Sequence, residues 1–330
     1  MAAAALAVAT LTSCGGVIYD GEGDCDSHFY VRFKFDYNMN SADALPSEVE
    51  QVTLHLLDAD GNVVWRKTES GPALAEEGYR MEVDVAPGTY SLMAWCSSAD
   101  PETFSMGDGD TRENLQVSFA TEAYADGSLH IDHDLDRLYH GYEADVTFPN
   151  LEGEDYTHLL PLIKDTNHIT VALQQLCGEP IDKYLVRFEI IDDNAHLNWD
   201  NSLITGKPVT YHEWHKDAVK GDISSRAVDN QTFAGVVADL TVSRLMENRR
   251  GDARLRVYRT DTGEDIVSIR LIDALLLVKG YYNRHWGDQE YLDRKDDYSL
   301  VFFLDENHKW IDGLIKIESW RVVYQEHDLN

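Results

Sequence analysis

Short stretches in which apolar and polar residues alternate recur along the chain, and this two-residue period limits what the chain can fold into. In HFYVRFKFDY, residues 28–37, the apolar Phe29, Val31, Phe33 and Phe35 are separated by polar residues or by Tyr30. Successive side chains of a β-strand point to opposite faces, so the stretch predicts a strand with one buried face. The chain is therefore expected to be built from sheets.

Turn signals separate the alternating stretches. QVTLHLLDADGNVVW (51–65) holds the turn residues DADGN between two apolar halves, and MEVDVAPGTYSLMAWC (81–96) repeats the pattern around Pro87 and Gly88. Both predict paired strands. Further strands are predicted at residues 144–148, 168–176, 184–191, 253–259, 266–272, 298–304 and 315–324. Helix is predicted only at 237–247 and 273–279, together with a short helical turn in LHIDHDLDRLYHG (129–141).

Many short strands separated by regularly spaced turns favour antiparallel sandwiches over a parallel α/β fold. A chain of 330 residues is long enough for two domains, each with its own core. Pro149, Gly153 and Pro161 punctuate a polar stretch that marks the boundary. We expect an all-β chain, with one sandwich domain over residues 28–155 and a second over 156–330.

The N-terminal stretch MAAAALAVATLTSCGG is typical of an export signal. Leu11, Thr12 and Ser13 before Cys14 resemble the lipobox at which bacterial signal peptidase II cuts before a cysteine that becomes acylated. We expect residues 1–13 to be a signal peptide and residues 14–27 a lipidated tether, because the apolar run is too short to span a bilayer. A frayed apolar tail or a short buried helix stays open as an alternative, since no Lys or Arg precedes Arg32.

Charge and cysteine content narrow the function further. The chain carries 28 basic and 59 acidic residues, a net charge of −31, which repels phosphate backbones and argues against nucleic-acid binding. Apart from Cys14, the cysteines Cys25, Cys96 and Cys177 allow one disulfide at most, and we interpret them mainly as small core residues.

Two stretches imitate metal motifs. YHEWH (211–215) has the spacing HExH instead of the zinc motif HExxH. Asp132, Asp134 and Asp136 with Glu143 match positions of a calcium loop, but Arg137 stands where that loop needs glycine. We expect YHEWH to be an aromatic surface loop and the carboxylates to lie on a solvated polar loop, neither of them holding a metal.

No motif indicates catalysis. The chain has no GxSxG elbow, and its carboxylates cannot be paired for acid–base chemistry from the sequence. We therefore expect no enzymatic activity and no cofactor other than the covalent lipid on Cys14.

Several motifs in a fixed order resemble the FimB-type anchor and minor-subunit family of type V fimbriae. They follow the lipobox and are VRFKFDYNMN (31–40), VTLHLLDADGNVV (52–64), PGTYSLMAWC (87–96), DLDRLYHG (134–141), IKDTNHITVALQQL (163–176), DRKDDYSLVFFLDENHKWI (293–311) and IKIESWRVVYQ (315–325). The resemblance implies two transthyretin-like antiparallel β-sandwich domains in tandem. It also implies a lipid-anchored protein displayed on the outer membrane, with a fimbrial shaft subunit as its partner.

The resemblance also implies a mode of assembly. In such pili a shaft subunit loses its first strand, and the vacated groove accepts a strand from a neighbour by β-augmentation. An anchor must keep residues 29–35, because a cut before them would release the fold from its lipid. It would therefore donate a strand or pair edge to edge. The candidate contact strand is the C-terminal segment containing Ile315, Ile317, Trp320, Val322 and Tyr324. An ordinary core strand of the second domain is the alternative.

Two other functions stay open. A carbohydrate-binding surface lipoprotein of a glycan-uptake system would use exposed tryptophans to stack on sugar rings, the candidates being Trp65, Trp95, Trp199, Trp214, Trp286 and Trp310. A secreted hydrolase would need two facing carboxylates in one pocket. Within a fimbria the chain would be either the basal anchor or another minor subunit, and surface ligands would be met by the assembled fimbria.

Overall fold

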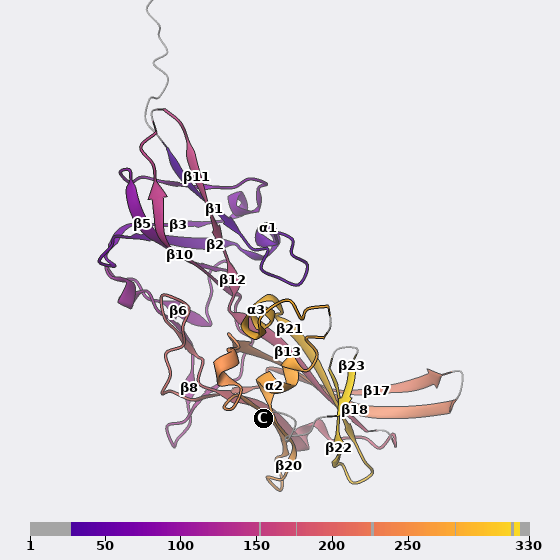
Figure 1. Ribbon diagram of the computed structural model, residues 1–330. Coiled ribbons are helices and arrows are strands. Elements are labelled where there is room, and N and C mark those ends of the chain that lie inside the picture. Colours follow the sequence, from indigo (N-terminus) through magenta and orange to yellow (C-terminus); the bar gives the residue numbers. More distant parts are fainter. Residues whose placement is uncertain are drawn as a thin grey trace, which may run out of the picture.

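The structure is a computed structural model that describes residues 28–151, 153–175, 177–225, 228–280, 282–317 and 320–323 (Figure 1). Strands dominate it, and two α-helices longer than a single turn, α2 (Leu271–Leu276) and α3 (Asp288–Arg294), lie in its C-terminal half. The expected all-β class, with two sandwiches in tandem, is confirmed.

The N-terminal sandwich stacks a three-stranded sheet on a five-stranded one. The smaller sheet has the order β11–β1–β4, with bounds Tyr156–Pro161, Phe29–Lys34 and Met81–Val83. The larger sheet has the order β12–β10–β5–β2–β3, with bounds Ile163–Lys164, Leu138–Phe148, Gly88–Ser97, Gln51–Leu57 and Val63–Ser70. The one-turn helix α1 (Leu45–Glu48) and a 3₁₀ turn (Pro72–Ala75) complete this part.

The C-terminal part contains two six-stranded sheets and a small third sheet. One six-stranded sheet has the order β17–β18–β13–β21–β22–β23, with bounds His215–Ser225, Val228–Ser243, Thr166–Gln175, Asp297–Leu304, Trp310–Ile317 and Trp320–Val323. The other has the order β20–β19–β14–β16–β9–β8, with bounds Asp265–Arg270, Arg254–Arg259, Val186–Asp192, Val209–His212, Leu129–Ile131 and Glu122–Ala123. The third has the order β15–β7–β6, with bounds His196–Leu197, Val117–Phe119 and Phe104–Met106.

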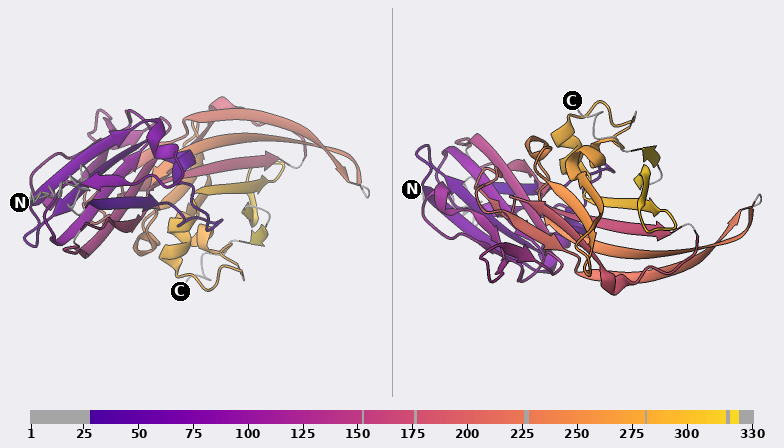
Figure 2. Two further views of the ribbon diagram at one scale, coloured as in Figure 1. Left: turned by 90° about the horizontal axis from the view of Figure 1, so that it is seen from above. Right: turned by 90° about the horizontal axis from the view of Figure 1, so that it is seen from below.

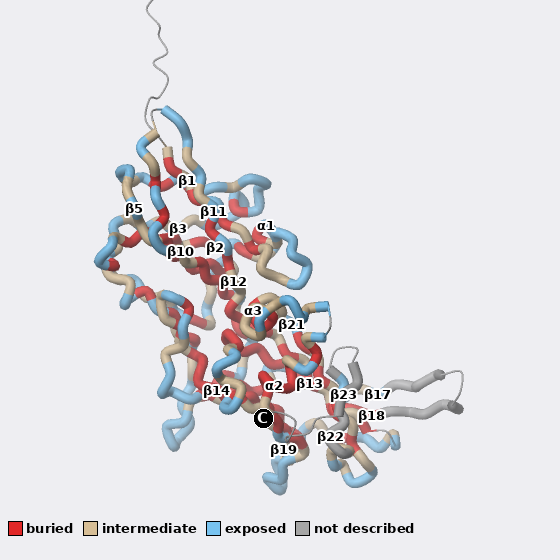
Figure 3. Tube along the Cα trace, in the orientation of Figure 1, coloured by how far each residue is buried: buried red, intermediate tan, exposed pale blue. Residues whose placement is uncertain are grey.

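Alternation along the strands places the cores as expected. Phe29, Val31 and Phe33 on β1 are at most 3% exposed, whereas Arg32 between them is exposed. The buried residues follow the strands of both sandwiches (Figure 3). They form two hydrophobic clusters, one inside the N-terminal sandwich and one that extends through the C-terminal part.

The division of the chain between these two cores differs from the expected boundary at residues 155/156. Strand β11 follows that boundary, yet it pairs in parallel with β1, and β12 pairs with β10. Conversely, β9 of the first half pairs with β16, and β7 pairs with β15. The chain therefore crosses between the two parts after β5, before β10 and after β12.

Two of the helical predictions are wrong. Residues 237–247 were expected to be helical, but most of them lie in β18, where Val236, Ala238, Leu240 and Val242 are buried at a period of two. Residues 129–141 contain β9 and the start of β10 instead of a helical turn. Gly141 lies inside β10, where a Cβ atom would come within 2.8 Å of Leu162 Cδ2 and 3.0 Å of the Pro161 carbonyl oxygen. Glycine therefore allows a close approach of the segment that leads into β12.

The β17–β18 hairpin was not predicted and changes the outline of the molecule. Its two strands pair from His215↔Asp239 to Ser225↔Val228. The hairpin extends far beyond the other strands of its sheet (Figure 2). Its outer strand β17 forms one edge of the six-stranded sheet.

Charged groups join the two parts where β12 leads into β13. Lys164 Nζ lies 3.2 Å from Glu48 Oε2 in the N-terminal sandwich and 2.6 Å from Asp296 Oδ2 in the C-terminal part. The Arg294 guanidinium lies 4.0 Å from the ring centre of Tyr37. His140 on β10 donates from Nε2 to the carbonyl of Trp199 at 2.9 Å, since a carbonyl only accepts. Contacts from both parts therefore fix the junction.

The buried His140 predicts a pH dependence of stability. Burial, with the Arg244 guanidinium adding to it, lowers the pKa of His140 to about 4. The unfolded chain therefore takes up a proton below pH about 6.5 that the folded chain does not, and the free energy of unfolding falls as the pH drops from about 6.5 to about 4. In denaturant titrations, His140→Gln should reduce this slope by about 1.4 kcal/mol per pH unit.

The glutamine amide can still donate to Trp199, so the expected change concerns the slope and not the fold. Burial also lowers the pKa of His55 and His212 to about 4, and the variant should keep their share of the pH dependence. An unchanged slope in His140→Gln would contradict the assignment.

Candidate functional site

The structure describes only part of the predicted site. Leu11, Thr12, Ser13 and Cys14 lie outside the described residues, as does Tyr324 of the candidate contact strand. The expected lipidation site therefore stays a prediction from the sequence.

The C-terminal segment was predicted as one strand from 315 to 324, and this is wrong. The chain reverses between β22 and β23, which pair antiparallel with Ile315↔Val322 and Ile317↔Trp320. A signal in the sequence was available, because Ile315 and Ile317 fall on odd positions, whereas Trp320, Val322 and Tyr324 fall on even positions. Such a change of phase indicates a turn.

The two strands of this hairpin have different surroundings. Strand β22 lies inside the sheet between β21 and β23, with Phe302↔Ile315 in register, and the Ile315 side chain is fully buried. Strand β23 lies at the edge, and no strand of the described chain pairs with its outer side. An edge of this kind presents unpaired backbone N–H and C=O groups to another strand.

The first described strand fills its own place in the N-terminal sandwich. Strand β1 lies between β11 and β4, with six residue pairs to β11 and three to β4. The rings of Phe29 and Phe148 stack with their centres 5.0 Å apart, and the rings of Phe35 and Tyr139 meet edge to face with their centres 5.1 Å apart. The described N-terminal sandwich therefore has no vacant strand position in the centre of its smaller sheet.

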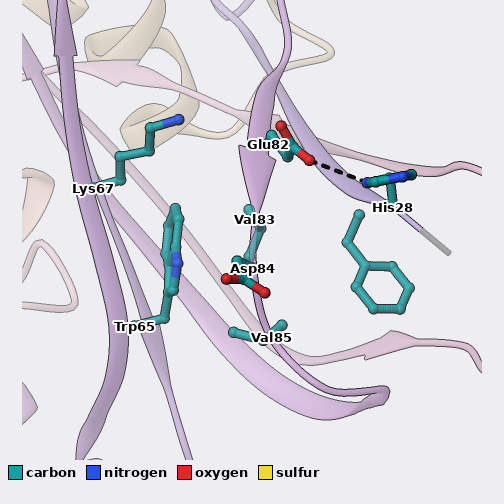
Figure 4. A pocket seen from close by; sticks show the side chains of 8 residues that line it. His28, Trp65, Lys67, Glu82, Val83, Asp84 and Val85 are labelled. Carbon is teal, nitrogen blue, oxygen red and sulfur yellow. Dashed lines mark hydrogen bonds and ion pairs between the residues drawn. The ribbon is translucent and has the colours of Figure 1, made fainter. Parts of the chain in front are cut away.

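A cavity of about 510 Å³ opens beside the start of β1, between the edge strands β3 and β4 (Figure 4). It is lined by His28, Phe29, Trp65, Lys67, Glu82, Val83, Asp84 and Val85. His28 Nδ1 lies 3.1 Å from Glu82 Oε1. The half-buried Trp65 offers an aromatic face next to carboxylates and an ammonium group, which is a lining suited to a polar ligand that also has an apolar face.

Residues of the two metal-like motifs form hydrogen bonds with other groups of the protein. His212 ends β16, and its Nε2 forms a hydrogen bond of 2.7 Å with the Tyr124 hydroxyl. His215 begins β17 in another sheet, and its Nδ1 lies 3.0 Å from Asp239 Oδ2. Asp136 accepts from the backbone N–H groups of Glu102 and Thr103. Within the described ranges, no three His, Cys, Asp or Glu side chains are grouped so as to hold a metal ion.

The tryptophans and cysteines correct two further expectations. Trp95 is 1% exposed and donates to the carbonyl of Leu115 at 3.0 Å, so it cannot stack on a sugar. Of the six candidate tryptophans only Trp214 is exposed, at 36%, and Trp65, Trp199, Trp286 and Trp310 are partly buried. Cys96 is buried as expected, but Cys177 is exposed, and both are free thiols.

Sequence reasoning missed a buried charged cluster beside the junction. Arg244 donates to both oxygens of Asp293, at 2.9 and 2.8 Å, and also to the carbonyl of Asn201. Asp165, which is fully buried, accepts from Asn201 Nδ2 at 2.8 Å, and burial raises its pKa to about 7 against the effect of Arg244. No local motif marks these residues, because they are far apart in the chain.

Comparison with known proteins shows which family and which solved structures this chain is similar to. The family model for fimbrillin-A associated anchor proteins Mfa1 and Mfa2 matches residues 22–326. The minor fimbrium anchoring subunit Mfa2 of Porphyromonas gingivalis is 25% identical over 269 residues, which cover 81% of this chain and 76% of that protein. The solved structure of the fimbrial anchor protein Mfa2 from P. gingivalis shares the fold, with a TM-score of 0.65 at 16% identity over 91% of this chain and all of that one.

Two solved structures from Bacteroides thetaiotaomicron have more similar sequences. One, described as a candidate adhesin, is 32% identical with a TM-score of 0.78 and covers 90% of this chain and 97% of its own. The other, assigned provisionally to polysaccharide-binding proteins, is 28% identical with a TM-score of 0.75 and covers 92% and 99%.

The match to a family model over nearly the whole chain confirms the resemblance seen in the order of the motifs. Among the described residues, no helix has the length and apolar composition needed to cross a membrane. The chain belongs to the family of fimbrillin-A associated anchor proteins, which are fimbrial proteins of the cell surface.

Proposed function

We propose that this chain is an outer-membrane lipoprotein, acylated on Cys14, that anchors a fimbria at the cell surface and binds the adjacent shaft subunit by β-strand addition at β23. Its role is structural, and we assign it no catalytic activity. The observation that carries the proposal is the position of β1, which fills the centre of its own sheet. A subunit with this strand in place offers no groove for a donor strand and must offer an edge instead.

The outer edge of β23, which no described strand covers, supports placing the pilin contact there. Strand β23 is the last described strand, and four residue pairs join it to β22. Donating β23 to a neighbouring subunit would break these four pairs. Strand β22 is a poor donor, because withdrawing it would expose the fully buried Ile315. We therefore assign pilin contact to β23, with Trp320, Val322 and the following Tyr324, and assign Ile315 to the core.

A second candidate function is saccharide binding in the cavity beside His28. The cavity combines the partly buried Trp65 with Lys67, Glu82 and Asp84, which are groups that stack on a sugar ring and bond its hydroxyls. A related structure is assigned provisionally to polysaccharide-binding proteins. The two functions do not exclude each other, because the cavity and β23 lie in different parts of the fold.

The proposed anchor predicts a lipid on the first mature residue. The intact mass of protein purified from membranes should correspond to a chain that starts at Cys14 and carries a diacyl or triacyl adduct. In Cys14→Ala the adduct should be absent. The protein should then leave the membrane fraction, because the acyl chains on Cys14 are its proposed membrane attachment. Protease treatment of whole cells should degrade the wild-type protein if it faces outward. An unacylated chain in the wild-type membrane fraction would contradict the proposal.

The assignment of β23 predicts different outcomes for its removal and for a change in β22. A chain that ends at Ile317 should keep a cooperative unfolding transition and lose capture of the shaft subunit. Ile315→Ala should lower the free energy of unfolding by about 2–5 kcal/mol, because it opens a cavity in the core, and should still capture the shaft subunit. Full capture by the chain that ends at Ile317 would rule out β23 as the contact.

The saccharide candidate predicts an effect of Trp65. If the cavity binds a sugar, glycan-array signals of the wild-type protein should fall about tenfold or more in Trp65→Ala, corresponding to the loss of one stacking contact of about 1.5 kcal/mol. The matched control is Trp214→Ala, which changes an exposed tryptophan on the other sandwich. Equal loss in both variants, or no glycan signal from the wild-type protein, would remove this candidate.

A further inference from the structure

We propose that the sheet β11–β1–β4 is a mechanical clamp, which carries tension between the membrane tether and the remainder of the protein. The inference rests on the proposed acylation of Cys14, because that lipid would place the load on the residues that lead into β1. The fold itself decides how β1 responds to such a load.

The direction of β1 sets the geometry of pulling. Its first residue, Phe29, packs on Phe148, at the end of β10 that is paired with Gly88. The chain leaves this sandwich at the opposite end, where Ser97 pairs with Leu138. Tension between the tether and the C-terminal part therefore runs along the strands, from one end of the sandwich to the other (Figure 1).

The parallel pair β1 and β11 converts this tension into shear. Phe29 is in register with Tyr156 and Lys34 with Pro161, and β11 continues through β12 toward the C-terminal part. The start of β1 is thus pulled one way and the end of β11 the other way. All hydrogen bonds between the two strands are then loaded together, whereas a strand pulled from its partner at one end loses them one at a time.

Side chains reinforce the end of the sheet at which the load enters. Arg80, next to β4, lies with its guanidinium carbon 3.5 Å from the ring centre of Tyr30 on β1. The same guanidinium donates to Thr157 on β11 at 3.1 Å and to Asp155 at 2.9 Å. Arg80 therefore links all three strands of the sheet across its outer face.

The backbone pattern of β11 fits this role. The N–H of Tyr156 donates to the carbonyl of His28, and the N–H of Leu162 donates to the carbonyl of Lys34. By the two-residue period, His158 also donates toward β1, while Leu159 and Pro161 face the open side of this edge strand. Pro161 has no backbone N–H, and it lies at a position where the N–H would not pair with β1.

The test is single-molecule stretching of the full chain in two geometries. Both variants carry Cys14→Ala, Cys177→Ser and Ala99→Cys, and Cys96 is fully buried and does not react with the handles. In the first variant force is applied between the native Cys25, before β1, and position 99, after β5. In the second variant Cys25→Ser and Asn40→Cys move the first handle past β1.

The second geometry is the matched control, because it places both handles at one end of the sandwich. Gln51 at the start of β2 is in register with Ser97 at the end of β5, so these strands are separated one pair at a time. We expect the rupture force from Cys25 to be several-fold higher than from Asn40. Equal forces, or a higher force from Asn40, would overturn the clamp.

Proline substitutions test the same ladder within the first geometry. His158→Pro removes a donor to β1 and should lower the rupture force, whereas Leu159→Pro should leave it unchanged. Glu143→Ala controls for the side-chain contact of His158 with Glu143 at 3.0 Å, which the proline variant also loses. The same force in both proline variants would overturn the role of β11. Purified protein without lipid or shaft subunit is used, so failure of the clamp is distinct from failure of the proposed anchoring.

Discussion

The burial of strand β5 on both faces is the constraint on which the two-part structure depends. Leu92, Ala94 and Cys96 point into the core of the N-terminal sandwich, while Met93 and Trp95 belong to the core of the C-terminal part. All five side chains are at most 1% exposed. A central strand with apolar residues on both faces cannot leave one face in water without exposing several large side chains. The two cores are therefore joined through a shared layer, and the C-terminal part covers a sheet face that would otherwise be open.

Charged groups specify how the two parts meet. The pair Arg244–Asp293 is buried, and Asp165 beside it lies on the segment that crosses from β12 to β13. Desolvation offsets much of the attraction in such pairs, so they contribute little net stability. Their donors and acceptors must nevertheless be matched in one arrangement, because a buried charge left unpaired costs far more than the pair gains. We interpret this cluster as fixing the geometry of a junction that the apolar contacts of β5 stabilise.

The sequence predicts elements whose environment is encoded locally. The phenylalanines of β1, the DADGN turn between β2 and β3, and the apolar alternation of β13 each specify a strand within a few residues. The partner of a strand is not encoded in this way, so the assignment of β11 to the first sandwich was missed. The helix prediction for residues 237–247 overlooked the alternation of apolar residues that starts at Val236 and continues along β18. Trp95 is buried and Cys177 is exposed because of how distant segments pack around each of them. The residues next to them in the sequence do not reveal this packing.

The three crossings between the two parts have a consequence for the order of folding. The N-terminal sandwich is closed by β10, β11 and β12, which follow a segment whose strands β7 and β9 belong to the sheets of the C-terminal part. During synthesis from the N-terminus, β1 can pair with β11 only after the residues between them have been made, and the same holds for β9 and β16. Contacts between such distant residues form slowly, because the intervening chain loses entropy before the contact compensates for it. Neither sandwich can therefore be completed early as a separate folding unit, and the two halves of the protein reach their native state together.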